Sequence, residues 1–134
     1  MTARNSTMFG EPGHAYVYFT YGMYHCFNAV TAPQGVGEAV LIRAVEPIEG
    51  IDLMTRNRPV ENPRNLTSGP GKLCIAFGLD KRHNALDLTS SELLIVGAEN
   101  VSPSEIAATT RIGIRTAADK PWRFYIKGNP WVSK

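Results

Sequence analysis

The stretch from residue 14 to residue 28, HAYVYFTYGMYHCFN, is the densest aromatic segment of the chain. From Ala15 to Tyr21, aromatic residues alternate with small or β-branched ones, which is the two-residue period of a strand. Gly22 interrupts this alternation as the turn of a hairpin would. A turn here leaves large, partly apolar side chains at the hairpin tip, where soluble proteins usually carry Asn, Asp, Gly or Ser. The exposed tip therefore predicts a binding partner for this hairpin.

The composition is that of an ordinary globular domain. The chain has 134 residues, of which 43% are hydrophobic and 19% charged, and its formal net charge is +2. This length fits one domain that can bury a core. The small net charge alone does not predict a polyanionic partner, but Lys and Arg concentrate in residues 56 to 82 and 111 to 134. These segments either converge into one phosphate-binding patch or form separate solvated faces.

The cysteines and histidines do not form a metal-binding pattern. Cys26 and Cys74 are far apart, and His14, His25 and His83 are scattered along the chain. Zinc sites need ligands at short, characteristic spacings, so a structural metal is not expected. Two isolated cysteines fit buried thiols in a reducing compartment. The polar first nine residues do not resemble a signal peptide, and no apolar run approaches ~18 residues. We therefore expect a soluble, intracellular protein with no membrane partner.

The periodicity of the sequence predicts an α+β fold, a single mixed domain around a curved antiparallel β core with a few short helices. The predicted strands cover residues 14 to 21, 24 to 31, 38 to 45, 92 to 96, 106 to 114 and 123 to 127. The predicted helices cover residues 51 to 58 and the segment between Ser68 and Gly78. Ser68 is the expected N-cap of the second helix, and Gly78 its stop. Residues 103 to 110 are equally compatible with a short helix.

Two segments could carry chemistry of their own. SGPGK at residues 68 to 72 lacks the full spacing and the trailing Ser or Thr of a nucleotide-binding loop. Its free N–H groups and Lys72 could hold one backbone phosphate, or the segment is simply a glycine-rich helix start. Arg43 is a cation in the apolar run EAVLIRAV. It either pairs with Glu38 or Glu46, or it lines a pocket and orients a water or an acid there.

Five ordered blocks of the sequence resemble the alkyladenine, or 3-methyladenine, DNA glycosylase family. They are TARNSTMFGEPGHAYVYFTYGMYHCFN, AVLIRAVEPIEG, SGPGKLCIAFG, RIGI and RFYIKGNPWVS, and together they extend from Thr2 to Ser133. The resemblance implies a base excision repair enzyme whose aromatic hairpin projects toward double-stranded DNA. Such an enzyme flips an alkylated or deaminated purine out of the duplex and hydrolyses its N-glycosidic bond. The implied lesions are of the 3-methyladenine, hypoxanthine and ethenoadenine class.

The resemblance also implies a monomer that needs no metal or organic cofactor. Such a protein is expected in the cytoplasm, at the nucleoid in a bacterium, or in the nucleus in a eukaryote. The alternative function is a non-catalytic nucleic-acid-binding domain that uses the same aromatic hairpin and basic flanks.

Individual roles follow from the same resemblance. Tyr21 matches the side chain that wedges into the minor groove and fills the gap left by the flipped nucleotide, with Met23 and Tyr24 beside it. Tyr18 matches a residue that stacks on the flipped base, where an electron-poor methylated purine gains extra attraction. Asn28 matches the residue that lies against purine C2 and whose bulk rejects the amino group of guanine.

Further positions complete the implied site. Tyr16 and Leu41 belong to the base pocket, and Arg43 helps to hold the attacking water. Contacts with the DNA backbone are predicted from charge and position for Arg4, Lys72, Arg111 and Lys127.

One departure from the family pattern bears on catalysis. The family's general base is a Glu in an ETEAY-like motif, followed by an SHxxRG stretch, and neither motif occurs in these 134 residues. We therefore expect that the chain begins partway through a glycosylase domain. Loss of a general base typically costs about 10² to 10⁴-fold in rate. The 134 residues alone are then expected to be weakly stable and to release little or no damaged base.

Overall fold

The structure is a computed structural model of the chain, and it describes residues 1 to 98 and 100 to 133. Short helices are combined with two antiparallel sheets, which confirms the predicted α+β class. The larger sheet has the strand order β1-β2-β3 and consists of β1 (Ala15–Thr20), β2 (Tyr24–Val30) and β3 (Ala39–Leu41). The smaller sheet pairs β4 (Ile106–Thr109) with β5 (Arg123–Ile126). The helical segments are α1 (Ile51–Asn57), α2 (Pro70–Phe77) and the 3-10 turns η1 (Ser6–Phe9), η2 (Pro63–Asn65), η3 (Lys81–His83) and η4 (Pro103–Glu105).

The predicted hairpin is confirmed, and its turn is tight. The amide of Met23 donates to the carbonyl of Thr20 at 3.1 Å, which places Tyr21 and Gly22 at the centre of a β-turn, and Met23 completes a three-residue connection because Thr20 pairs with Tyr24. Both central residues have a left-handed backbone, with φ of 55° for Tyr21 and 63° for Gly22. Positive φ at both central positions is the pattern of a type I′ turn. Gly22 takes this conformation without cost, whereas for Tyr21 it is strained.

Helix α2 covers one face of the larger sheet and forms the main core with it. The buried apolar cluster contains Ala15, Val17, Phe27, Leu73, Cys74, Leu79 and Leu88. A second cluster of Met54, Leu66 and Ala76 joins α1 to α2. Gly71 permits the close approach of α2 to β2, because a Cβ atom at this position would lie 2.6 Å from the ring of Tyr24.

Several predicted elements are shorter or differently bounded than expected. The strand predicted for residues 38 to 45 is limited to β3, so Arg43 lies beyond its end. The strand predicted for residues 92 to 96 is wrong, since this segment runs as a loop attached to Leu88 through the Ile95 amide at 2.9 Å. The strand predicted for residues 106 to 114 ends at Thr109. The helix considered for residues 103 to 110 is only the 3-10 turn η4 before β4.

The predicted N-cap of α2 is wrong, and its predicted end is confirmed. Ser68 is not the N-cap, because Gly69 occupies that position and no side chain caps the helix. The Ser68 hydroxyl instead accepts a hydrogen bond from Lys72 Nζ at 3.5 Å. Gly78 ends the helix as predicted, with φ of 69° and its amide directed at the carbonyls of Cys74 and Ile75.

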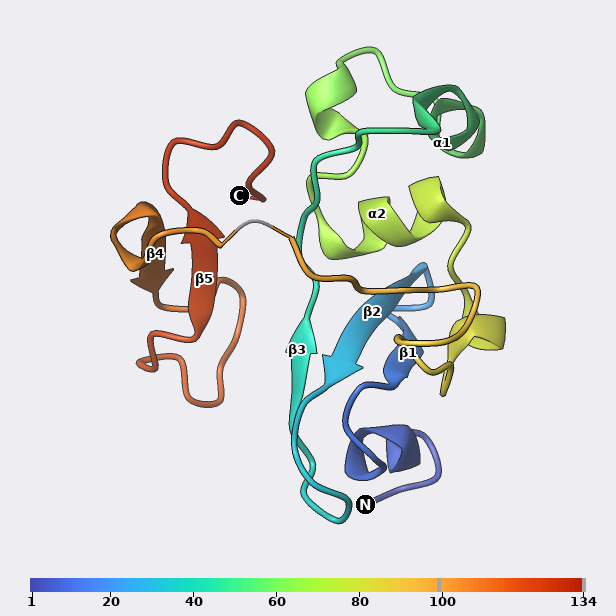
Figure 1. Cartoon of the computed structure of the whole chain (residues 1–134), viewed down its shortest axis with the longest axis vertical. Helices are drawn as coiled ribbons and strands as arrows, with labels where there is room; N and C mark the ends of the chain where they lie inside the picture. Colours follow the sequence, from blue (N-terminus) through green and yellow to red (C-terminus); the bar gives the residue numbers. More distant parts are fainter. Residues whose placement is uncertain (99, 134) are drawn as a thin grey trace.

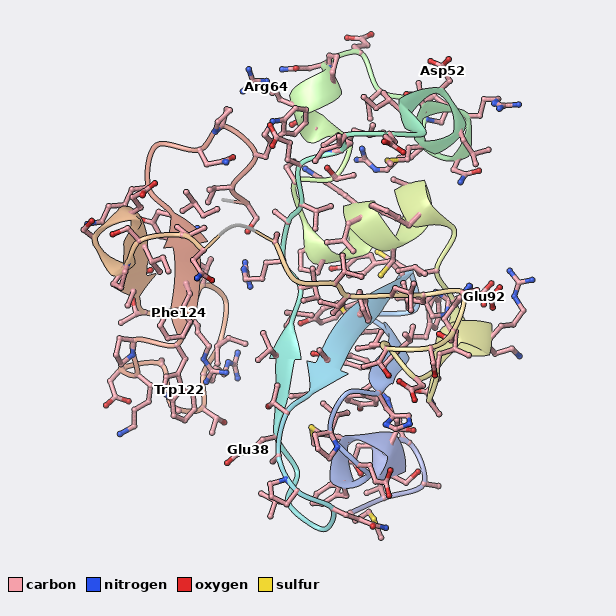
Figure 2. The ribbon with its side chains drawn as sticks, in the orientation of Figure 1. Glu38, Asp52, Arg64, Glu92, Trp122 and Phe124 are labelled. Atoms are coloured by element: carbon pink, nitrogen blue, oxygen red, sulfur yellow. The ribbon has the colours of Figure 1, made fainter. Side chains whose placement is uncertain are left out.

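The smaller sheet lies to one side of the larger one, beyond β3 (Figure 1). Figure 2 shows Trp122 and Phe124 on this side of the molecule and Glu38 next to β3. A cleft of about 990 Å³ opens between the two parts and is lined by residues of β3, β5 and the segments on either side of them. Within the described residues, no helix has the length and hydrophobicity needed to span a bilayer.

Candidate functional site

The hairpin tip presents two of the three predicted intercalating side chains to solvent. Tyr21 is 80% exposed and Met23 is 74% exposed. Tyr24, at the start of β2, is partly buried and packs next to Gly71 of α2. Its ring centroid lies 6.0 Å from that of Tyr21. Tyr24 therefore connects the exposed tip to the body of the domain, while Tyr21 and Met23 form its apolar point.

The four predicted pocket residues lie on one face of the larger sheet. The register pairs Tyr16 with Asn28, and Asn28 with Leu41. Directly opposed residues of antiparallel strands point to the same face, and residues two apart on one strand do so as well. One face of the sheet therefore carries Tyr16, Tyr18, Asn28 and Leu41. Val17 and Phe27 lie on the opposite face, in the core formed with α2. The rings of Tyr16 and Tyr18 are 5.1 Å apart between centroids.

The amide of Asn28 is fixed in place. Asn28 is 7% exposed, and its Nδ2 donates to the carbonyl of Tyr16 at 3.2 Å. A buried amide held by a neighbouring strand has little freedom to rotate away from a ligand. The structure thus places a rigid polar group beside the tilted pair of tyrosine rings.

Tyr18 is a neutral phenol under ordinary conditions. Burial, together with the neighbouring Cys26 thiol, raises its pKa to about 12, and the cation of Arg4 opposes this rise. Burial also raises the pKa of Tyr16. Both rings therefore carry no charge near neutral pH and offer uncharged aromatic faces.

Arg4 lies against this aromatic pair. Its Cζ is 5.6 Å from the Tyr18 ring centroid, and its Nη2 donates to the carbonyl of Phe19 at 2.8 Å. The residue was predicted to contact the DNA backbone, and the structure places its guanidinium on the hairpin itself.

Arg43 turns toward the C-terminal end of the chain. Its Nε donates to Ser133 Oγ at 3.3 Å, and Ser133 is 5% exposed. The Ser133 carbonyl accepts a hydrogen bond from Arg123 Nη2 at 2.6 Å. Burial, and next the nearby cation of Arg123, lower the pKa of Arg43. Neither Glu38 nor Glu46 forms an ion pair with Arg43 among the described residues, so that structural alternative is wrong.

The cleft contains both Arg43 and Arg123 and reaches Leu41, one of the four predicted pocket residues. Leu41 and Arg43 line it from the larger sheet, while Arg123, Tyr125 and Ser133 line it from the smaller sheet and the C-terminal segment. The sequence predicted Arg123 only as part of the basic segment from residue 111 to residue 134, and it predicted no role for Ser133. The signal that pointed to both residues is the block RFYIKGNPWVS, which begins at Arg123 and ends at Ser133.

The residues predicted to contact the DNA backbone lie in different parts of the molecule. Lys72 lies in the first turn of α2, near the hairpin. Arg111 donates to the Thr116 carbonyl at 2.7 Å and stacks over the Trp122 ring at 5.2 Å. Lys127 donates to the carbonyl of Ser104 at 3.0 Å. Arg111 and Lys127 therefore stabilise the part of the chain around the smaller sheet, on the other side of the cleft from the hairpin.

The described residues contain no group of three or more His, Cys, Asp or Glu side chains that could hold a metal ion. Cys26 and Cys74 are buried free thiols. Burial raises the pKa of Cys74 to about 12, and burial also raises the pKa of Cys26. Neither thiol is in the reactive thiolate form near neutral pH.

Comparison with known proteins gives a consistent result over nearly the whole chain. The family model described as methylpurine-DNA glycosylase matches residues 1–130.

Three relatives bear the name "Putative 3-methyladenine DNA glycosylase". The protein from Carboxydothermus hydrogenoformans is 52% identical over 134 residues, which is 99% of this chain and 70% of the relative. The protein from Alkaliphilus oremlandii is 50% identical over 145 aligned residues, covering 100% of this chain and 71% of the relative. The protein from Methanoculleus marisnigri is 48% identical over 136 aligned residues, covering 99% of this chain and 71% of the relative. On this match and these identities, the chain belongs to the methylpurine-DNA glycosylase family.

Proposed function

We propose that this protein takes damaged purines out of duplex DNA and acts on their N-glycosidic bond. The observation that carries the proposal is the placement of Tyr16, Tyr18, Asn28 and Leu41 on one sheet face, two strands of which are joined by an exposed aromatic turn. A pocket that stacks on a base and a wedge that fills the space it leaves are the two parts that base flipping requires.

The wedge is Tyr21, supported by Met23. An apolar side chain that is mostly exposed in the free protein loses unfavourable contact with water when it enters a base stack. This gain offsets the few kcal/mol, by general estimates, that unstacking one nucleotide costs. The turn holds Tyr21 at the hairpin tip with its side chain exposed to solvent, where it is free to enter a duplex.

The pocket selects for altered purines by stacking and by shape. Tyr18 offers a neutral, electron-rich ring, which attracts an electron-poor alkylated purine more strongly than a normal one. Asn28, held by the Tyr16 carbonyl, occupies space that the 2-amino group of guanine would need. Undamaged guanine is thereby excluded by steric conflict rather than by weaker attraction.

Arg43 is the candidate for holding the attacking water. Its guanidinium lines the cleft and can donate a hydrogen bond to a water oxygen, but a cation cannot accept the proton that the water loses. The family resemblance assigns this proton to a Glu in an ETEAY-like motif, which does not occur in these 134 residues. The 134-residue polypeptide is therefore expected to recognise lesions better than it cleaves them.

The decisive experiment compares binding with base release. The purified chain is titrated into a duplex with one central 1,N6-ethenoadenine or hypoxanthine, and into the matched undamaged duplex. We expect tighter binding to the lesion and little base release under single-turnover conditions. Rapid release would contradict the proposed lack of a proton acceptor. Equal affinity for both duplexes would favour the alternative, a non-catalytic nucleic-acid-binding domain.

A further inference from the structure

Arg4 is held in a defined position before the first strand begins. It lies in a short turn closed by hydrogen bonds between its neighbours, with the Thr2 amide donating to Asn5 Oδ1 at 2.7 Å and the Thr2 hydroxyl donating to the same oxygen at 3.0 Å. The 3-10 turn η1 follows directly. The backbone around Arg4 is thus fixed locally, and its side chain starts from a set direction toward β1.

The guanidinium of Arg4 contacts two parts of the hairpin, the Tyr18 ring and the backbone at Phe19. Its planar group lies over the Tyr18 ring, with 5.6 Å between Cζ and the ring centroid. One of its terminal nitrogens donates at 2.8 Å to the carbonyl of Phe19, the residue that follows Tyr18 and precedes the last residue of β1. A single side chain therefore contacts the ring proposed to stack on a purine and the backbone that leads to Tyr21.

The electrostatic surroundings agree with this geometry. Burial raises the pKa of both Tyr16 and Tyr18, and the Arg4 cation opposes this rise at both phenols. The ion pairs among the described residues involve only Asp80, Arg82 and His83. Arg4 is therefore held by a ring and a carbonyl rather than by a carboxylate, and this kind of contact fixes the orientation of a planar group.

We propose that Arg4 is a positioning residue of the candidate base pocket, which holds the Tyr18 ring and the end of β1 in the orientation needed to stack on an extruded purine. This assignment rests on the proposed function and replaces the predicted role of Arg4 as a backbone-phosphate contact. A phosphate contact acts equally on damaged and undamaged DNA, because every nucleotide carries the same phosphate. A residue that orients the stacking ring acts only when a base has left the helix.

This difference makes the salt dependence of binding the first test. Affinities of the wild type, Arg4→Ala and Arg4→Lys are measured for the ethenoadenine duplex and the undamaged duplex at several salt concentrations. We expect Arg4→Ala to lose about tenfold or more in affinity for the lesion duplex, with unchanged affinity for undamaged DNA and an unchanged salt slope. Arg4→Lys, which keeps the charge but loses the planar group, should recover only part of the loss.

The opposite pattern would overturn the proposal. Equal losses on both duplexes, with a salt slope reduced by about 0.9, would identify Arg4 as one phosphate contact. Unchanged lesion affinity in Arg4→Ala would also reject a positioning role. Arg56→Ala, which removes an exposed arginine from α1, is the matched control for the loss of one positive charge and should retain the preference for the lesion.

A second readout separates failure of this proposal from failure of the proposed function. The ring proton and carbon chemical shifts of Tyr18 are recorded by NMR in the free protein at neutral pH, without DNA. They should change in Arg4→Ala and stay constant in Arg56→Ala. If the wild type shows no preference for the lesion, the proposed function fails, and the Tyr18 shifts still decide whether Arg4 orients the ring. Unchanged shifts in Arg4→Ala would reject the positioning role whatever the binding results.

Discussion

Asn28 and Tyr16 are directly opposed on β2 and β1, and the Asn28 side chain donates to the Tyr16 carbonyl at 3.2 Å. The same hydrogen bond orients the amide and ties together the two strands that carry the aromatic pocket. The proposed selectivity at the purine C2 position therefore relies on a side chain whose orientation is set by this one hydrogen bond.

Replacement of Asn28 by Ser should therefore change recognition as well as stability. The shorter side chain leaves room for the guanine amino group and cannot reach the Tyr16 carbonyl in the same way. We expect the ratio of affinity for lesion to undamaged guanine-containing duplex to fall, and the free energy of unfolding to decrease by about 1 kcal/mol. Urea unfolding and binding titrations measure the two effects. Asn65→Ser, at an exposed position, is the control, and an unchanged ratio in Asn28→Ser would contradict the steric role.

Replacement of Tyr21 by Asn should stabilise the protein and weaken lesion recognition at once. Tyr21 adopts φ of 55°, and Asn tolerates the left-handed region far better than a bulky residue does. We expect the free energy of unfolding to rise by about 0.5 to 1 kcal/mol. Affinity for the lesion duplex should fall more than affinity for undamaged DNA, because the wedge is lost. Lower stability of the variant, or equal losses on both duplexes, would contradict this account.

Replacement of Gly71 by Ala should disturb the base of the hairpin tip. The added Cβ would lie 2.6 Å from the Tyr24 ring, so the ring or the start of α2 must move. Overpacking of this kind typically costs about 1 to 3 kcal/mol in the free energy of unfolding. Gly97→Ala is the matched control, because nothing lies within 4 Å of a Cβ built there. Thermal unfolding of the two variants should differ clearly, and equal melting temperatures would show that the contact is relieved without cost.

Asp80 should contribute stability that depends on acid pH. Hydrogen bonds from Arg82 hold the pKa of Asp80 at about 2, below its ordinary value of 3.8. The folded state thus favours the ionised carboxylate, and its contribution is present above the ordinary pKa and is lost as the pH falls toward 2. We expect the melting temperatures of the wild type and Asp80→Asn to differ most above pH 5 and to converge near pH 2. A difference that stays constant over this range would contradict the linkage.

Local sequence was enough to predict the hairpin, because alternation and a central glycine are properties of neighbouring residues. It was not enough for the strand expected to contain Arg43. The Arg43 side chain bonds to Ser133, a partner 90 positions away that no local pattern reveals. Residues 92 to 96 have the apolar content of a strand, but no strand among the described residues pairs with them. Periodicity does not show whether such a partner is present.

Only part of the candidate site could be predicted from the sequence. The residues on the hairpin could be named because their parity on two strands fixes which face they share. The opposite wall of the cleft could not, since Arg123 and Ser133 meet Arg43 only through tertiary packing. For Arg4 the sequence offered only its charge, which predicts a phosphate contact, and its position over the Tyr18 ring is a tertiary contact that no local pattern reveals.

The separation of the two sheets has a consequence for how the molecule opens. Among the described residues, one buried apolar cluster joins the larger sheet to α2 and the other joins α1 to α2, and neither includes a residue of β4 or β5. The smaller sheet should therefore unfold locally at a lower free-energy cost, as a cooperative unit of its own. Amide hydrogens of β5 should exchange with solvent faster than those of β2. The stacking face would then stay intact while the wall that holds Arg123 and Ser133 opens and closes beside it.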